Sequence, residues 1–190
     1  MQRKLLNGNQ LKVIAIIAIT IDHIASVLFP NYPTDWWVIV LHIIGRLAAP
    51  LFWGLIALVI NDSTKLKQWQ KTLLILGITV ITFCSDWSCI AILAILQIGE
   101  NRGNFKKQMQ GMMIWVSVYA IVYAIFIHPV YGILQLFVAL TIPLLKMYNG
   151  ERGNWKGMKW VFYIYYPLHL VLCGLIRIAL YGNIGVMIGG

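Results

Sequence analysis

Ionisable side chains lie inside segments of this 190-residue chain that are otherwise apolar. Asp22 and His23 interrupt one such segment, and His42 and Arg46 interrupt a second. His169 interrupts a third, near the end of the chain. Imidazole titrates near neutral pH, so a buried histidine can take up and release a proton during a reaction. The residue types therefore indicate proton-transfer chemistry inside the apolar part of the molecule.

The elements that must position these residues are long apolar helices. The chain is 60% hydrophobic and 11% charged, whereas soluble domains carry about a quarter charged residues, which excludes a water-soluble globule. The pattern predicts a single all-α polytopic membrane domain over 1–190, in contact with membrane lipid. Its seven apolar segments are 11–29, 36–60, 69–84, 87–98, 109–127, 130–147 and 158–181.

Basic residues mark alternate links between these segments. All of the 15 Lys and Arg residues except Arg46 and Arg177 lie on links that the positive-inside rule assigns to the cytoplasm. We therefore expect a multi-pass membrane protein with a cytoplasmic N-terminus. The net charge of +9 does not indicate a nucleic-acid partner, because the basic groups lie in short links rather than on one hydrated face.

Segments 69–84 and 87–98 are shorter than the ~20 residues of an untilted span. Joining them into one helix would reverse the charge pattern, so we expect a short hairpin that turns at 85–87, made of two short spans or a re-entrant pair. Cys84 and Cys89 flank this turn and either pair or remain free thiols. No spacing of Cys and His resembles a metal site, so no metal is expected.

Helix geometry separates the two neighbouring polar residues of the first segment. Asp22 and His23 lie about 100° apart around a helix, so they cannot face the same partner. Asp22 shares its face with the small residues Ala15, Ala18 and Ala25, which let another helix approach closely. His23 faces elsewhere, toward a wet cavity in the simplest arrangement.

His42 and Arg46 are four residues apart and present one helix face. An ion pair between Asp22 and Arg46 serves either to hold two helices together or to take part directly in chemistry. His42 is interpreted as a helix-packing histidine.

Four short strings occur in order along the chain: Thr20-Ile21-Asp22-His23, Gly45-Arg46-Leu47-Ala48-Ala49-Pro50, Tyr148-Asn149-Gly150-Glu151-Arg152-Gly153 and Phe162-Tyr163-Ile164-Tyr165-Tyr166-Pro167-Leu168-His169-Leu170. Together they resemble the TraX family of membrane proteins, which is named for the acetylase of conjugative pilin. The second and fourth strings are also similar to parts of larger membrane acyltransferases.

The resemblance implies a multi-pass protein of the bacterial cytoplasmic, or inner, membrane. It also implies transfer of an acetyl group from acetyl-CoA to an amine, such as the N-terminus of a secreted peptide or pilin. In this hypothesis His23 is the general base, His169 orients or relays, and Asp22 paired with Arg46 positions the helices. Arg46 or a tyrosine such as Tyr166 supplies the donor for the oxyanion. The coenzyme phosphates would bind a loop that includes Asn149, Gly150, Glu151, Arg152, Gly153 and Lys156.

The sequence leaves three alternative functions open. The same histidines could acetylate a hydroxyl of an exported glycan or lipid. An inactive membrane assembly factor is a second alternative, because family members often carry an acidic residue followed by glycine where this chain reads Ala57-Leu58-Val59. A small proton-relaying transporter is the third, although the chain lacks the paired repeats typical of that class.

Overall fold

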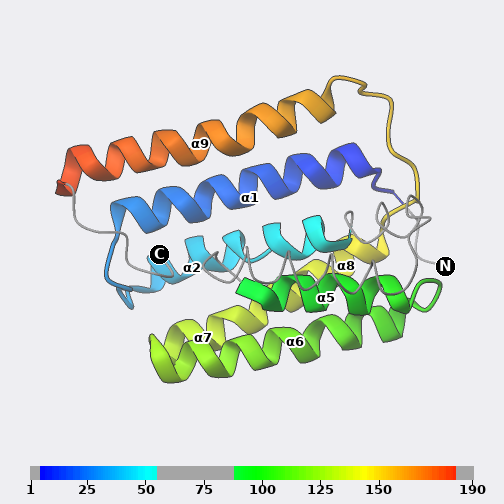
Figure 1. The fold of residues 1–190 in the computed structure, drawn as a ribbon, viewed down its shortest axis with the longest axis horizontal. Helices are drawn as coiled ribbons and strands as arrows, with labels where there is room; N and C mark the ends of the chain where they lie inside the picture. Colours follow the sequence, from blue (N-terminus) through cyan, green and yellow to red (C-terminus); the bar gives the residue numbers. More distant parts are fainter. Residues whose placement is uncertain (1–4, 55–87, 183–190) are drawn as a thin grey trace. The chain divides into compact units, whose positions relative to one another are not determined.

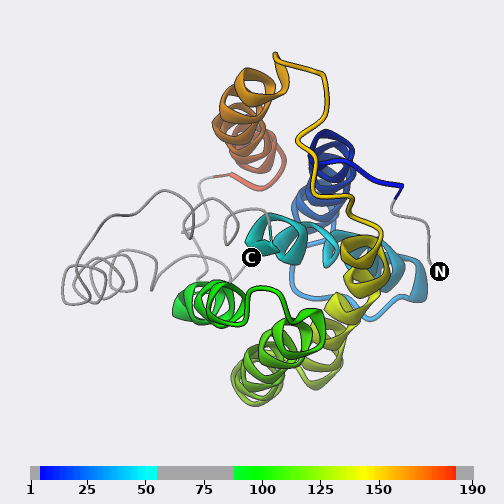
Figure 2. The same ribbon diagram turned by 90° about the vertical axis from the view of Figure 1, so that its right-hand side faces the viewer.

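The computed structural model of the chain describes residues 5–54 and 88–182, and every regular element within these ranges is a helix (Figures 1 and 2). Five of the described helical segments are long and apolar enough to cross a membrane: Gly8–Leu28, Trp36–Gly54, Phe105–Phe126, Pro129–Lys146 and Ile164–Tyr181. A soluble fold would not expose so many apolar helices of this length. The chain is therefore an all-helical membrane protein.

The helix boundaries follow the apolar segments of the sequence closely. The last segment, 158–181, coincides with α9 (Met158–Tyr181), and the segments 11–29, 109–127 and 130–147 agree with described helices to within a few residues. The segment 36–60 begins at α2 and is described only as far as residue 54. The segment 87–98 corresponds to α5 (Ser88–Glu100). Three features of the sequence lie outside the described residues. They are the segment 69–84, the hairpin turn at 85–87, and the residues 57–59, where family members often carry an acidic residue followed by glycine. The total of seven segments and the orientation of the chain remain predictions.

The first of two compact units contains α1 (Gly8–Leu28), α2 (Trp36–Gly45), α8 (Thr141–Lys146) and α9. Helix α1 packs against both α2 and α9, as both ribbon views show. It begins at a capping box in which Asn7 and Gln10 exchange side-chain and backbone hydrogen bonds. This cap determines the residue at which the helix begins.

Small residues allow α1 and α2 to approach each other closely. Ala15, Ala18 and Ala25 of α1 are all buried. On α2, a Cβ atom added to Gly45 would overlap the side chain of Asp22. The contact therefore requires glycine at position 45, because Asp22 occupies the space that any side chain there would need.

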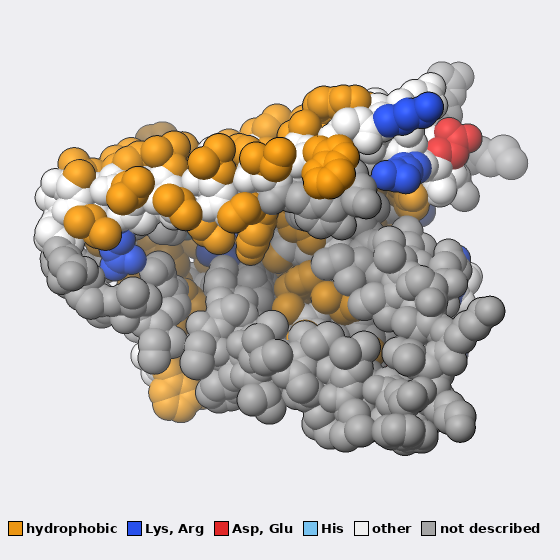
Figure 3. All heavy atoms as spheres, turned by 45° about the horizontal axis from the view of Figure 1, so that its top comes forward, with side chains coloured by type: hydrophobic (Ala, Val, Ile, Leu, Met, Phe, Trp, Pro, Cys, Tyr) orange, Lys and Arg blue, Asp and Glu red, His pale blue; other side chains and the backbone are white. Residues whose placement is uncertain are grey.

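Helix α9 contacts α1 along one face and exposes large apolar side chains elsewhere. Leu168, Leu172 and Leu175 are each more than half exposed. Figure 3 shows hydrophobic side chains along the length of this helix, with basic and acidic side chains gathered together beyond one end. A surface of this kind is stable in contact with lipid tails rather than with water.

The second unit contains α5, α6 (Phe105–Phe126) and α7 (Pro129–Gln135). Helix α6 packs against both of its neighbours. Gly132 of α7 lies so close to Ala120 and Ala124 of α6 that a side chain at position 132 would collide with them. After α7 the apolar segment continues as a 3-10 turn, η1 (Leu136–Leu140), and then as α8 of the first unit.

We predict that Gly45→Ala destabilises the protein, because its methyl group would overlap Asp22 at its Cβ and Cγ atoms. Overpacking of this kind typically costs about 1–3 kcal/mol. The melting temperature of the purified protein in detergent is the measurement.

Gly174→Ala is the matched control for this change. It lies within α9, and a Cβ atom there meets no neighbouring atom within 4 Å. It should leave the melting temperature unchanged or raise it slightly, because alanine favours helix more than glycine does. Equal melting temperatures for the two variants would contradict the proposed close approach of α1 and α2.

Candidate functional site

Asp22 lies at the centre of a buried polar cluster between α1 and α2. Its Oδ1 atom is 2.8 Å from Nδ1 of His42, and its Oδ2 accepts a hydrogen bond of 3.4 Å from the Arg46 guanidinium. All three residues are at most 8% exposed. The spacing of four residues places His42 and Arg46 on one face of α2, so both reach the same carboxylate. With a neutral His42, the carboxylate and guanidinium charges cancel, which lowers the cost of burying them.

The next residue of α1 faces a different helix. Nδ1 of His23 lies 3.0 Å from Nε2 of His169 on α9, and the two ring planes are 11° apart. Nδ1 of His169 in turn lies 3.0 Å from the backbone carbonyl oxygen of Tyr165. His169 is buried, and His23 is partly buried. The structure thus brings together His23 and His169, two of the residues for which the sequence predicted a catalytic role.

The carbonyl group of Tyr165 determines how protons are arranged in this histidine pair. A carbonyl oxygen can only accept, so Nδ1 of His169 carries the proton that it donates. Nε2 of a neutral His169 is then an acceptor, and His23 must donate from its Nδ1. The Nε2 atom of neutral His23 consequently holds a lone pair, which is the state that a general base requires.

Tyrosine residues of α9 surround the histidine pair. The ring of Tyr165 is nearly parallel to that of His169, with ring centroids 4.9 Å apart, and the ring of Tyr166 meets it edge-on at 5.5 Å. The hydroxyl groups of Tyr165 and Thr20 are hydrogen-bonded to each other, and Thr20 also donates to the carbonyl of Ile16. These contacts fix α9 against the face of α1 that carries His23.

The separation of Asp22 from His23 agrees with the helix geometry expected from the sequence. The structure differs in what His23 faces, because His169 and α9 occupy the side where we expected a wet cavity. Ser26, which shares this side, donates to the backbone carbonyl of Asp22. The pairing of His42 with Asp22 was not predicted, although the spacing of His42 and Arg46 already implied that both face one partner.

The loop at 149–153 lies against the beginning of α1. The first two N–H groups of the helix, at Gly8 and Asn9, donate to the carbonyls of Glu151 and Arg152 at 2.8 and 3.0 Å. The third is bound by the capping side chain of Asn7. The helix N-terminus is therefore already satisfied and offers no ready anion site.

In the predicted coenzyme loop, the groups open to a ligand are side chains and not the N–H groups of the helix start. Arg152 and Lys156 are exposed, as are Glu151 and Gly150. Asn149 closes a local turn in which its side chain accepts a hydrogen bond of 2.8 Å from the backbone N–H of Glu151. Gly153 has a positive φ of 88° and lies against Asn7, so the loop requires glycine there.

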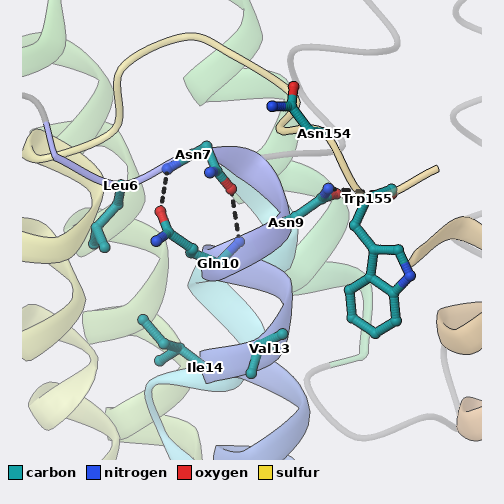
Figure 4. A pocket seen from close by; sticks show the side chains of 8 residues that line it. All are labelled: Leu6, Asn7, Asn9, Gln10, Val13, Ile14, Asn154 and Trp155. Carbon is teal, nitrogen blue, oxygen red and sulfur yellow. Dashed lines mark hydrogen bonds between the residues drawn. The ribbon is translucent and has the colours of Figure 1, made fainter. Parts of the chain in front are cut away.

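A cavity of about 500 Å³ opens beside this loop (Figure 4). Asn7, Asn9 and Gln10 of the α1 start line it, together with Asn154 and Trp155. Its remaining walls are the apolar side chains of Leu6, Val13 and Ile14. The part of the chain that the structure describes contains no group of His, Cys, Asp and Glu side chains arranged to hold a metal ion.

We predict that Asp22→Asn strongly destabilises the protein, because Arg46 then remains a buried cation without its carboxylate. Removing one partner of a buried ion pair typically costs about 3–5 kcal/mol. Thermal unfolding in detergent measures the loss. Asp35→Asn is the control, since Asp35 is exposed and makes no capping hydrogen bond at the start of α2. Equal stability of the two variants would refute a structural role for the cluster.

Comparison with known proteins identifies the chain's relatives. Neither the curated proteins nor the solved structures contain a match. A family model described as "TraX protein" matches residues 7–98 and 55–177, two overlapping stretches that together span most of the chain. These stretches include Asp22, His23, Arg46, His169 and the loop at 149–153. The chain therefore belongs to the TraX family.

Proposed function

We propose that this protein is a multi-pass acetyltransferase of the bacterial cytoplasmic membrane, which transfers an acetyl group from acetyl-CoA to an amine. The acceptor we favour is the N-terminus of a secreted peptide or of a pilin, in keeping with membership of the TraX family. The observation that supports the proposal is the hydrogen-bonded pair of His23 and His169 between two apolar helices. Imidazole can take up a proton and release it again during a reaction, which is what a general base must do.

The reaction needs a base because the nitrogen of the acceptor must lose two protons on the way to an amide. An α-ammonium group, with a pKa near ~8, first releases one proton to water and becomes a neutral amine. In the proposed step Nε2 of His23 takes the second proton while the amine nitrogen bonds to the thioester carbonyl carbon. The tetrahedral intermediate then collapses, the carbon–sulfur bond breaks, and the thiolate receives this second proton from His23. The products are an amide and a thiol, and the histidine returns to its neutral state.

His169 acts in this scheme as a positioning residue. When His23 becomes an imidazolium, its Nδ1–H continues to donate to Nε2 of His169, which holds the ring in place. The backbone carbonyl of Tyr165 fixes the tautomer of His169 and therefore the direction of the whole chain of hydrogen bonds.

The developing oxyanion needs a hydrogen-bond donor, for which two residue types were candidates. Arg46 already binds the carboxylate of Asp22 in the buried cluster, which favours a structural role for its guanidinium. The Tyr165 hydroxyl is used as well, because Thr20 donates its own proton to Ile16 and so accepts the proton of Tyr165. We assign the oxyanion donor to Tyr166, whose ring contacts His169.

The proposed orientation places the coenzyme and the acceptor on opposite sides of the membrane. The start of α1 and the basic loop at 149–153 would face the cytoplasm, where acetyl-CoA is made. His23 lies 15 residues beyond the start of α1, which corresponds to about 22 Å along the helix. The histidine pair would therefore be reached by the acetyl group from inside and by the acceptor from outside.

We predict that His23→Gln lowers acetyl transfer by about 10²- to 10⁴-fold, the usual contribution of a general base. The assay follows labelled acetyl from acetyl-CoA onto peptides with free N-termini in proteoliposomes that contain the protein. His169→Gln should have a smaller effect, because a glutamine oxygen can still accept from Nδ1 of His23.

His128→Gln is the control for loss of a histidine, since His128 caps α7 in the second unit and lies outside the proposed site. Its activity should match that of the wild type. Full transfer by a folded His23→Gln protein would exclude His23 as the base. Labelling of a sugar hydroxyl in place of the peptide amine would instead identify an O-acetyltransferase.

The orientation predicts opposite labelling of two engineered cysteines in a variant whose three native cysteines are replaced by serine. A membrane-impermeant maleimide should label Asp35→Cys in intact cells and Asn149→Cys only after the membrane is opened. Labelling of Asn149→Cys in intact cells would reverse the orientation and contradict a cytoplasmic coenzyme loop.

A further inference from the structure

The wall of the cavity beside the start of α1 includes Asn9, whose side-chain oxygen is a buried hydrogen-bond acceptor without a donor in the described part of the chain. Asn9 is 7% exposed, and its Nδ2 donates to the backbone carbonyl of Trp155 at 3.2 Å. Its Oδ1 atom is buried and has no hydrogen-bond partner among the described residues. Leaving a buried carbonyl oxygen unsatisfied is costly, and a ligand N–H group in the cavity would remove that cost.

Two other amide side chains of the cavity are used by the protein itself. The side-chain oxygens of Asn7 and Gln10 accept hydrogen bonds from each other's backbone N–H groups in the capping box, as Figure 4 shows. The third, Asn154, is exposed, so water can satisfy its amide group. Asn9 differs from all three because its oxygen is buried and is not part of the box, so a ligand would remove the cost of its burial.

The lining of the cavity indicates an uncharged ligand segment. The eight side chains that form it are amide, aliphatic and indole groups, and none of them is charged. Cations lie just outside, because Arg152 and Lys156 are exposed on the adjoining loop. Lys12 on α1 is near enough to Arg152 for their charges to repel. A ligand with a neutral, amide-bearing segment inside and an anionic end outside matches this distribution.

The cavity also lies on the face of α1 that leads to the histidine pair. Asn9, Val13, Thr20 and His23 follow one another at spacings that keep them near one side of a helix. The 14 residues from Asn9 to His23 correspond to about 21 Å along the axis. The cavity and the histidine pair therefore lie near the same side of α1, the side on which His23 meets His169 of α9.

We propose that this cavity holds the amide-bearing pantetheine arm of the acyl donor, with Asn9 Oδ1 accepting an amide N–H of the arm. The inference rests on the proposed function and adds the subsite that selects the donor. Val13 and Ile14 contact the methylene groups of the arm. The phosphates of the donor remain outside, beside Arg152 and Lys156. The residues of the cavity thus recognise the neutral part of the donor independently of its nucleotide.

The test is the affinity of the detergent-purified full chain for acetyl-pantetheine, which carries the arm and lacks the nucleotide. Asn9→Leu keeps the size of the side chain but removes the acceptor, and it should weaken this binding at least tenfold. Val13→Phe fills the cavity without altering the helix cap and should weaken it similarly. Asn101→Leu, at the end of α5 in the second unit, is the matched control and should bind as the wild type does.

Two results would overturn the proposal. One is equal affinity for acetyl-pantetheine in the wild type and in folded Asn9→Leu and Val13→Phe proteins. The other is an equal weakening of adenosine 3′,5′-bisphosphate binding by these variants, which would place the nucleotide in the cavity.

A further measurement separates this inference from the proposed function. S-acetyl-N-acetylcysteamine carries the acetyl thioester on a shortened arm, and at high concentration its use as donor should depend on His23 but not on Asn9. Binding of acetyl-pantetheine that depends on Asn9, without transfer from any donor, would retain the subsite and reject the enzyme. Transfer from both donors that requires His23 but is unchanged in Asn9→Leu would retain the enzyme and reject the subsite.

Discussion

The structure of the first unit depends on neutralising one carboxylate inside an apolar helix pair. Asp22 cannot remain charged among lipid-facing helices unless partners surround it, and Arg46 and His42 of α2 are those partners. Both reach it only because Gly45 lets the two helices approach closely. The position of α2 relative to α1 is therefore set by the electrostatic requirement of a single residue, supported by the small side chains around it.

The same constraint determines where the chemistry can occur. Consecutive residues of a helix point about 100° apart, so once Asp22 faces α2, His23 must face another direction, where α9 packs. Helix α1 thereby carries a structural polar cluster on one side and a histidine pair on the other. A change in the Asp22 cluster would rotate or shift His23, so stability and proposed activity are linked through one helix.

The beginning of α1 shows how a helix terminus can be used for structure while a site forms beside it. Its N–H groups bind the carbonyls of Glu151 and Arg152 and its own cap, which holds the loop in place. Near that loop, exposed cations and a neutral cavity lie next to each other. This separation of charge from neutral polar groups suits a ligand with a charged end and an uncharged arm.

Most of the described helices could be predicted from the sequence, because runs of about twenty apolar residues bounded by charged links form helices in a membrane. The divergence of Asp22 from His23 and the shared face of His42 and Arg46 were predictable as well, since helix periodicity is a local property. The pairing of His42 with Asp22 and the contact of His23 with His169 came from the tertiary structure alone. Those contacts join residues 20 and 146 positions apart, and they depend on which helices pack together, which no local pattern specifies. The cavity at Asn9 likewise required the fold, because it forms only where a distant loop covers the start of α1.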